Sequence, residues 1–284
     1  MLKVLDICNF ECIKDKRKRT AIINDIKRSK LNWLENHPLV RLSDAKLFYS
    51  PVGNYPPEPI IIICGKATSK DSKELFWEYF YKTDNFRIAC LKSPYSNMKD
   101  NLFIYLYEIG LFGFLSKLNS YWADCCIKEE YKKKWDEIFK DFNASLKSGM
   151  QITQAINCAI INNDTKMASS QPSKKIIDEY KQMSNCFFKG FRITKRLELI
   201  IFLDTPSNTG FHQINLFKKQ MPDLIDKVIS ITHPSNQNWI VYKNLKNRRW
   251  NRMGNKGKNA KLLFNNASSK IKQLKIKLDN NYSE

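Results

Sequence analysis

The feature of this chain that most restricts its possible folds is the apolar run Ile60-Ile61-Ile62-Ile63-Cys64, which ends at Gly65. A strand with one face toward water alternates apolar and polar residues, whereas this run contains no polar position. An uninterrupted series of β-branched residues is typical of a strand buried on both faces. The run therefore predicts a parallel sheet that is covered by helices on both sides.

Further apolar runs along the chain resemble this first one, and segments with helical periodicity separate them. The runs are Ala155–Ile161, Leu197–Leu203 and Val228–Ile231. The helical segments are Leu75–Phe80, Tyr131–Leu146, Lys174–Phe188 and Phe211–Lys219. Strands that alternate with helices indicate an α/β fold with right-handed crossovers. We expect a three-layer α/β/α sandwich around a central four-stranded parallel sheet.

The chain is expected to have three parts. Residues 1–50 are basic and have apolar positions at near-helical spacing, which predicts a helical N-terminal extension. Residues 51–243 contain the four apolar runs and form the predicted α/β domain. Residues 244–284 are basic, and Ile271, Leu274 and Leu278 follow helical spacing, which predicts a basic helical tail. That tail either docks on the domain or is ordered by a nucleic acid.

The charge of the chain favours a polyanionic partner. It has 48 Lys and Arg against 28 Asp and Glu, a net charge of +20. Such a field attracts nucleic acids, because each neutralised phosphate releases counterions. Trp239, Tyr242 and Trp250 stand among the C-terminal basic residues, as base stacking requires. A lysine-rich surface without a partner and an anionic membrane surface are the alternatives. The candidate DNA-binding residues are Arg248, Arg249, Arg252 and Lys256.

Other properties exclude several classes of protein. No apolar run approaches the ~20 residues that span a bilayer, and the N-terminus lacks a signal-peptide core, so we expect a cytoplasmic monomer without a membrane partner. The eight cysteines include no Cys-x-x-Cys pair. We interpret most of them as core residues in a reducing compartment and expect no metal or cofactor. An iron–sulfur cluster that uses Cys8 and Cys12 is the alternative.

Candidate functional residues follow the predicted strands. Open parallel sheets bind ligands at the carboxyl ends of their strands. The segments at these ends are Gly65-Lys66-Ala67-Thr68-Ser69, Asn157–Asn163, Asp204-Thr205-Pro206-Ser207 and His233-Pro234-Ser235-Asn236. His233 is one of only three histidines, and histidine alone has an unperturbed pKa near neutrality. The end of the last strand is therefore the first candidate for chemistry.

The order of these segments resembles the uracil-DNA glycosylase superfamily. The resemblance rests on the loop that Gly65 begins, on Asn157, on His233-Pro234-Ser235 and on the pair Phe76-Trp77. It extends roughly from Pro59 to Trp239. It implies a glycosylase-like fold and a DNA enzyme that flips out a base and hydrolyses the N-glycosidic bond, which leaves an abasic site.

The resemblance also implies roles for individual residues. His233 would donate a hydrogen bond to the negative charge that develops on the departing base. Asn157 would bind a pyrimidine edge, and Ser235 would grip a phosphate. Trp239, chosen over Gln237 and Asn238, would fill the vacated stack. The implied substrate-binding residues are Gly65, Lys66, Ala67, Thr68, Ser69, Phe76, Trp77, Ser235, Asn236 and Trp239.

Each of these residues also has a structural interpretation. An asparagine in an apolar strand, such as Asn157, can simply satisfy a neighbouring backbone group. Phe76 and Trp77 are aromatic residues of the kind that fill cores. Ser235 suits the first position of a helix as a cap.

The chain departs from the family at Ala67. Active members have an acidic or amide residue two places after the glycine, where it holds the attacking water. The replacement for that group is Asp71, Glu74, Asp164 or Asp204, of which we select Asp71 as catalytic. Alternatively, His233 lowers the barrier by stabilising the leaving group, Lys66 forms a Schiff base, or cleavage is lost.

A second departure concerns the substrate. Thr68-Ser69 stands where uracil-selective members have Pro-Tyr, whose tyrosine excludes groups on pyrimidine C5. The smaller side chains predict a pocket for a modified pyrimidine, such as the hydroxymethyl or glucosylated cytosine of phage DNA, or otherwise uracil. The corresponding biological roles are anti-phage defence and DNA repair.

Two other functions compete with base excision. One is a catalytically inactive DNA-binding protein of the same fold. The other is a nuclease, because Asp178-Glu179-Tyr180-Lys181 resembles a Glu-x-Lys metal-nuclease element. The latter segment has helical rather than strand character, which disfavours a nuclease.

Overall fold

The computed structural model describes eleven stretches of the chain. They are residues 40–49, 52–67, 70–83, 85–92, 98–156, 158–163, 168–169, 174–179, 187–203, 213–234 and 254–281. The chain groups into two compact units, each built from three separate segments. The first unit comprises Met1–Tyr55, Cys64–Pro94 and Gln151–Ile193, and the second comprises Pro56–Ile63, Tyr95–Met150 and Thr194–Glu284.

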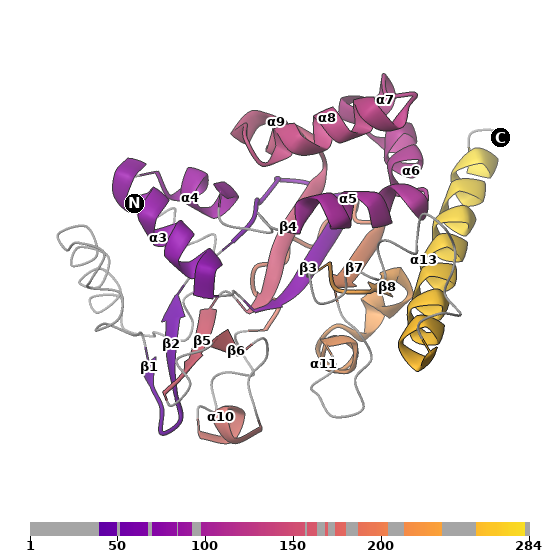
Figure 1. Ribbon diagram of the computed structural model, residues 1–284. Coiled ribbons are helices and arrows are strands. Elements are labelled where there is room, and N and C mark those ends of the chain that lie inside the picture. The colour runs from indigo at the N-terminus through magenta and orange to yellow at the C-terminus, as the bar shows by residue number, and fades with distance from the viewer. Residues whose placement is uncertain are drawn as a thin grey trace. The chain divides into compact units, whose positions relative to one another are not determined.

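Four strands form a parallel sheet in the order β4-β3-β7-β8 (Figure 1). Their bounds are Met150–Ile156 for β4, Ile61–Ala67 for β3, Leu199–Leu203 for β7 and Val228–Ile231 for β8. The side chains of β3 from Ile61 to Ile63 are fully buried, and so is every residue of β7. The prediction of a mixed α/β fold with a buried, parallel, four-stranded sheet is confirmed.

The predicted strand Ala155–Ile161 is in fact two strands in two different sheets. β4 belongs to the parallel sheet and ends at Ile156, whereas β5, Cys158–Asn162, pairs elsewhere. Asn157, which separates them, lies outside the described residues. The prediction of one strand was wrong because an apolar run records burial and does not specify which strand it pairs with.

The second sheet is antiparallel and has the order β1-β2-β5-β6. Its remaining strands are Val40–Arg41 for β1, Ala45–Tyr49 for β2 and Ala168–Ser169 for β6. Helix had been expected up to residue 50, and the described residues 40–49 correct this. Ala45 and Leu47 are buried while Lys46 between them is partly exposed, which is the two-residue period of a strand.

Three helices belong to the first unit. They are α3 (Lys70–Thr83), α4 (Phe86–Lys92) and α10 (Lys174–Glu179). The predicted helix Leu75–Phe80 lies within α3. The predicted helix Lys174–Phe188 is confirmed over α10 but is wrong at its end, where Phe187–Gly190 form a turn. Phe188 there has a positive φ of 58°, which a helix does not allow, and its amide donates to the Ala155 carbonyl at 2.8 Å.

The second unit contains most of the described helices. They are α5 (Lys99–Glu108), α6 (Leu111–Leu118), α7 (Ser120–Ala123), α8 (Lys128–Ile138), α9 (Phe142–Lys147), α11 (Gln213–Gln220), the 3-10 helix η3 (Pro222–Lys227) and α13 (Gly254–Asn281). The predicted helix Tyr131–Leu146 is divided into α8 and α9, because Asp141 caps α9 by accepting from the Ala144 amide at 2.6 Å. Within the described stretches, no helix is both long and apolar enough to cross a bilayer.

An aromatic cluster joins helices α5 to α8. The ring of Phe112 lies 5.1 Å from that of Trp122, 5.5 Å from Tyr131 and 6.1 Å from Trp135. Both indole groups are buried and donate to backbone carbonyls, Trp122 to Ser148 at 2.8 Å and Trp135 to Lys99 at 3.1 Å. Because every polar group of the two indoles is satisfied, the cluster gains apolar burial without an unpaired donor.

Helix α13 confirms a helix in the C-terminal tail over Gly254–Asn281. It contacts β8 and α6, and its buried residues are Ala260, Ala267 and Ile271. The spacing of these residues places them on one face of the helix. The small alanines allow a close approach to the rest of the unit, so the helix docks on the second unit, which was one of the two alternatives.

Gly53 and Asn54 hold their segment of the first unit against β4. The Asn54 amide donates to the Ile152 carbonyl at 3.0 Å, and the Asn54 side-chain oxygen accepts from the Ile152 amide at 2.6 Å. Gly53 has a φ of +107°, and a Cβ added there would lie 1.6 Å from the Ile152 oxygen. Only glycine permits this close approach of two backbones.

We predict that Gly53→Ala lowers the free energy of unfolding by at least about 3 kcal/mol, because the unfavourable φ adds to a backbone clash. The matched control is Gly110→Ala, where φ is +83° but the nearest atom would be 3.8 Å away. The control should lose only about 1 to 2 kcal/mol. Urea denaturation of both variants measures the difference, and equal losses would contradict the close approach.

Candidate functional site

His233 lies two residues after the end of β8, at the carboxyl end of the last strand as predicted. Its side chain is partly exposed, whereas its neighbours Thr232 and Pro234 are buried. A partly exposed imidazole between two buried residues keeps its backbone fixed while its ring stays accessible. Such a placement is compatible with contact between the ring and a ligand.

Helix α5 holds the segment that contains His233. The side-chain amide of Asn101 donates to the Pro234 carbonyl at 3.2 Å. One turn later, the buried hydroxyl of Tyr105 lies at Thr232. Burial raises the pKa of Tyr105 far above its usual range, although the polar groups of the nearby Thr232 partly oppose the rise. Because Asn101 and Tyr105 are four residues apart, both project from the same face of α5.

Helix α13 supports this arrangement from its buried side. The ring of Phe264 meets the ring of Tyr105 edge-on, with 5.7 Å between their centroids. The sequence analysis predicted neither α5 nor its two contacts with the His233 segment. The spacing of Leu102, Leu106 and Ile109, which are all buried, would have indicated the helix but not its partner.

The residues predicted around the first strand lie in the first unit. Gly65 is buried, and β3 continues through Lys66 to Ala67, so these three residues belong to the strand and not to a loop that starts at Gly65. Glycine was taken as the end of the strand, but in a buried strand it can also serve where no side chain fits. Lys66 and Ala67 are the last two residues of β3.

Helix α3 contains the next candidates. Asp71 lies in its first turn and Trp77 in its middle, and the structure describes only the backbone of both. Phe76 is fully buried. The structural interpretation of Phe76 as a core residue is therefore confirmed, and contact with a flipped base is not supported for it.

Several predicted residues lie outside the described stretches. They are Asn157, Thr68, Ser69, Asp164, Asp204, Ser235, Asn236, Gln237, Asn238, Trp239, Arg248, Arg249 and Arg252. The backbone of Lys256 lies in α13. The candidates that the structure describes are divided between the two units, with His233 and Lys256 in the second and the others in the first.

The nuclease element has a structural role. Asp178 and Glu179 end helix α10, as their helical character predicted. The two oxygens of the Glu179 carboxylate accept from the amide and the hydroxyl of Ser43, both at 2.7 Å. Among the described residues, no group of three or more His, Cys, Asp or Glu side chains could hold a metal ion. Cys64, Cys90 and Cys125 are buried in the core, whereas Cys126 is exposed.

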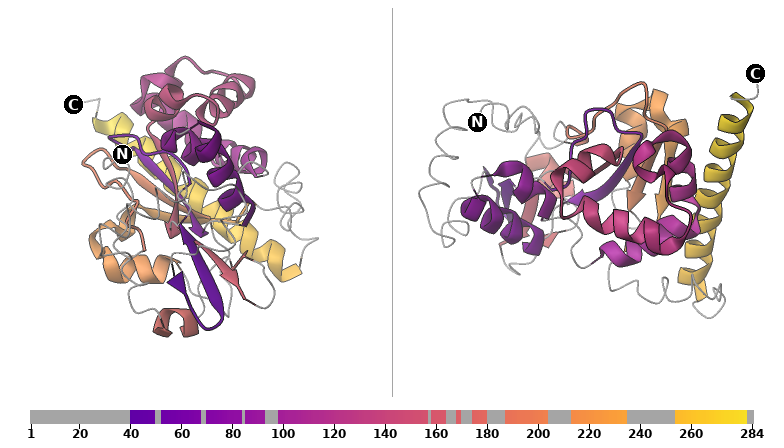
Figure 2. Two further views of the ribbon diagram at one scale, coloured as in Figure 1. Left: turned by 90° about the vertical axis from the view of Figure 1, so that its left-hand side faces the viewer. Right: turned by 90° about the horizontal axis from the view of Figure 1, so that it is seen from above.

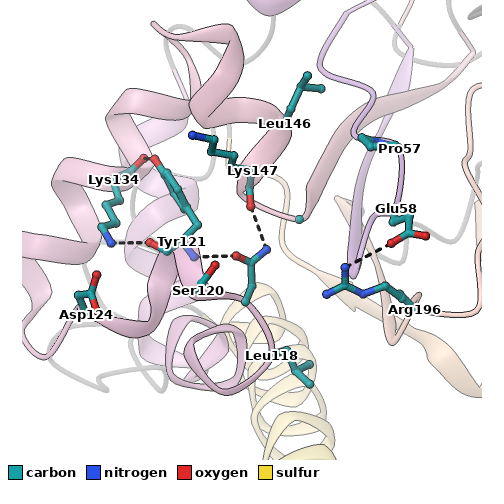
Figure 3. A pocket seen from close by; sticks show the side chains of 12 residues that line it. Pro57, Glu58, Leu118, Ser120, Tyr121, Asp124, Lys134, Leu146, Lys147 and Arg196 are labelled. Carbon is teal, nitrogen blue, oxygen red and sulfur yellow. Dashed lines mark hydrogen bonds and ion pairs between the residues drawn. The ribbon is translucent and has the colours of Figure 1, made fainter.

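A pocket of about 630 Å³ lies in the second unit, at the amino ends of the strands (Figure 3). The residues that line it are Pro57, Glu58, Leu118, Asn119, Ser120, Tyr121, Asp124, Lys134, Leu146, Lys147, Gly149 and Arg196. Residues 57–58 precede β3, residues 147–149 precede β4, and Arg196 precedes β7. It is therefore not the site predicted at the carboxyl ends.

The polar groups of this pocket mostly bind one another. Arg196 pairs with Glu58 at 3.3 Å, and the Tyr121 hydroxyl donates to the Lys134 carbonyl at 2.9 Å. Asn119 donates to the Lys147 carbonyl at 2.9 Å and accepts from the Tyr121 amide at 2.8 Å. A ligand there would have to compete with these contacts, so the pocket is better explained as part of the scaffold than as a reaction site.

Comparison with known proteins adds no support to the resemblance to uracil-DNA glycosylases, which rests on the residues quoted from the sequence. No family model, curated protein or solved structure matches the chain.

We predict that Tyr105→Phe weakens the dependence of stability on pH above 10. The folded protein keeps this phenol protonated because its pKa is raised, whereas the unfolded chain ionises near pH 10 and is thereby favoured as the pH rises. At pH 11 the wild type should lose about 1.4 kcal/mol more than the variant, relative to pH 8. Thermal unfolding at both pH values tests this, and parallel losses would refute it.

Proposed function

We propose that this chain is a DNA glycosylase that flips a base out of DNA and hydrolyses its N-glycosidic bond. Its fold would be the three-layer α/β/α sandwich of the uracil-DNA glycosylase superfamily, and it would act as a cytoplasmic monomer. The observation that carries the proposal is the placement of His233 after β8, on a segment that Asn101 binds through the Pro234 carbonyl at 3.2 Å.

The chemistry requires a donor at the departing base. Water adds to the sugar C1′ as the bond to the base nitrogen breaks, and the electron pair of that bond leaves with the base as an anion. The proton that the water loses finally neutralises this anion. A donor that is already oriented stabilises this anion without reorganisation. Asn101 binds the Pro234 carbonyl on one side of His233, and the Tyr105 hydroxyl lies at Thr232 on the other, which supports such a role. Asn157 would bind the base edge in the same step.

The attacking water needs a second group, because Ala67 has no polar side chain. Asp71 is our choice, since it stands four residues after Ala67, in the first turn of α3. A carboxylate in that first turn also suits the positive end of the helix dipole.

A modified pyrimidine is the proposed substrate. Thr68 and Ser69 leave space at C5, which suits a hydroxymethylated or glucosylated cytosine, with uracil as the alternative base. The second candidate function is a DNA-binding protein of the same fold that no longer cleaves. The alanine at position 67, at the end of β3, favours that alternative because no carboxylate replaces it directly.

The first test measures abasic sites in duplexes that contain uracil, mismatched thymine, hydroxymethylcytosine or glucosylated cytosine. We expect release of a modified cytosine, identified by mass spectrometry, and a loss of about 10² to 10³-fold in rate for His233→Ala. His37→Ala is the matched control and should retain the rate. Binding of all duplexes without any base release would favour the non-catalytic alternative.

A second test restores the missing carboxylate. If water positioning limits the reaction, Ala67→Asp should raise the rate of base release by about tenfold or more, the lower end of what a positioned base contributes. Ala67→Leu, which adds volume without a polar group, is the control. A rate that stays constant in Ala67→Asp but falls in Asp71→Asn would show that Asp71 already fills this role.

A further inference from the structure

The solvent-exposed side of α13 has an unusual distribution of charge. Within its 28 residues the helix has seven lysines, and its one acid, Asp279, forms an ion pair with Lys117 of α6. The exposed or partly exposed lysines that are free of any carboxylate among the described residues are Lys258, Lys261, Lys270, Lys272 and Lys277. Docking of the helix therefore leaves its positive charge in solvent.

These lysines form two rows along the helix. At about 100° per residue, Lys258, Lys261 and Lys272 fall within roughly 60° of one another, and Lys270 and Lys277 lie about 150° away around the axis. The helix runs along the edge of the second unit (Figures 1 and 2). Its buried residues lie on the side of the helix opposite the arc between the two rows.

The stripe between the two rows consists mainly of amide and hydroxyl side chains. Its exposed members are Leu262, Asn265, Asn266, Ser269, Gln273, Ile276 and Asn280. Amides of this kind bind the edge of adenine in the major groove, and apolar side chains contact the thymine methyl group. The two apolar members, Leu262 and Ile276, are 59% and 60% exposed, so both can reach a partner that lies on this face.

The dimensions of the helix also fit a groove. A helix with its side chains is about 10 to 12 Å wide and the major groove of B-form DNA is about 12 Å wide. A helix in that groove places its two flanks beside the two phosphate backbones. Lysines on both flanks and hydrogen-bonding groups between them match this environment.

Other partners fit the stripe less well. A helical partner would need apolar residues every three or four positions, but Leu262 and Ile276 are fourteen residues apart with polar positions between them. A membrane surface would need a continuous apolar face, and the apolar face of α13 is already buried in the unit.

We propose that the exposed face of α13 lies in the major groove of duplex DNA, with the two lysine rows on opposite phosphate backbones. The proposal deepens the proposed function and rests on its assumption that DNA is the partner. It does not depend on base release, because binding to an unmodified duplex measures it alone.

The experiment compares two variants of the full chain that each lose five positive charges. The test variant changes Lys258, Lys261, Lys270, Lys272 and Lys277 to Gln. The control variant changes Lys133, Lys140, Lys195, Lys218 and Lys219 to Gln, which are exposed on other elements of the second unit. Thermal unfolding and circular dichroism establish that both variants are folded.

Duplex affinity is then measured across a series of salt concentrations. The slope of log K against log salt should flatten by about 0.9 for each lysine that no longer contacts a phosphate, so by up to about 4.5 in the test variant. We expect at least a tenfold loss of affinity there and a clearly smaller effect in the control. Equal effects in the two variants would overturn the proposal.

An RNA duplex of the same sequence tests the groove itself. The major groove of A-form RNA is too narrow for side chains to enter, so the wild type should prefer DNA and the test variant should lose this preference. Asn265→Ala with Gln273→Ala should reduce the preference while the salt slope stays constant. Equal affinity of the wild type for both duplexes would overturn groove insertion.

The remaining outcomes separate this proposal from the others. The wild type could form a dimer that the double variant Leu262→Asn, Ile276→Asn does not form, which would make a second copy the partner and overturn the proposal. Lysine-dependent binding to anionic vesicles, without binding to DNA, would make a membrane surface the partner and also overturn it. Duplex binding that depends on α13, without release of any base, would support this proposal and refute the glycosylase. Base release by a test variant whose duplex binding is unaltered would support the glycosylase and refute this proposal.

Discussion

The complete burial of Ile61, Ile62 and Ile63 is the constraint on which the rest of the structure depends. Burial of each isoleucine contributes about 1.5 to 3 kcal/mol, and it requires apolar groups on both faces of the strand. The neighbouring β7 is buried throughout, so the same requirement extends across the sheet. The backbone at the start of β3 is satisfied as well, because the Ile60 carbonyl accepts from the Glu198 amide at 2.8 Å. Helices must therefore surround this sheet, and accessible side chains are confined to the strand ends.

The sequence alone predicted the helices and strands whose apolar residues follow directly from their burial. β3, β7, β8 and α13 belong to this class, because β-branched runs and the spacing of residues such as Ile271 reflect local environment. The change of sheet at Asn157 was not predictable, since strand pairing depends on segments that are distant in sequence. The same holds at the candidate site. The position of His233 follows from the run before it, whereas its support by Asn101 depends on a contact across 133 residues.

The two faces of α13 connect the structural argument with the functional one. On the inner face, Phe264 packs against Tyr105, which lies at Thr232 beside His233. On the outer face, lysine rows surround a polar stripe. A single helix thus adjoins the support of the candidate donor and presents the charge that would attract DNA. Occupation of the outer face would stabilise the docked helix and, through it, the orientation of the His233 segment.

The composition of each unit from three distant segments affects how the protein is made. The second unit needs Pro56–Ile63, Tyr95–Met150 and Thr194–Glu284, so its core includes residues that leave the ribosome long after its first strand. Until Ile271 of α13 has emerged, the apolar surface that this helix covers stays exposed to water. Long-range contacts of this kind slow folding and favour association of incomplete chains. The core of the second unit is therefore complete only after synthesis has passed through α13.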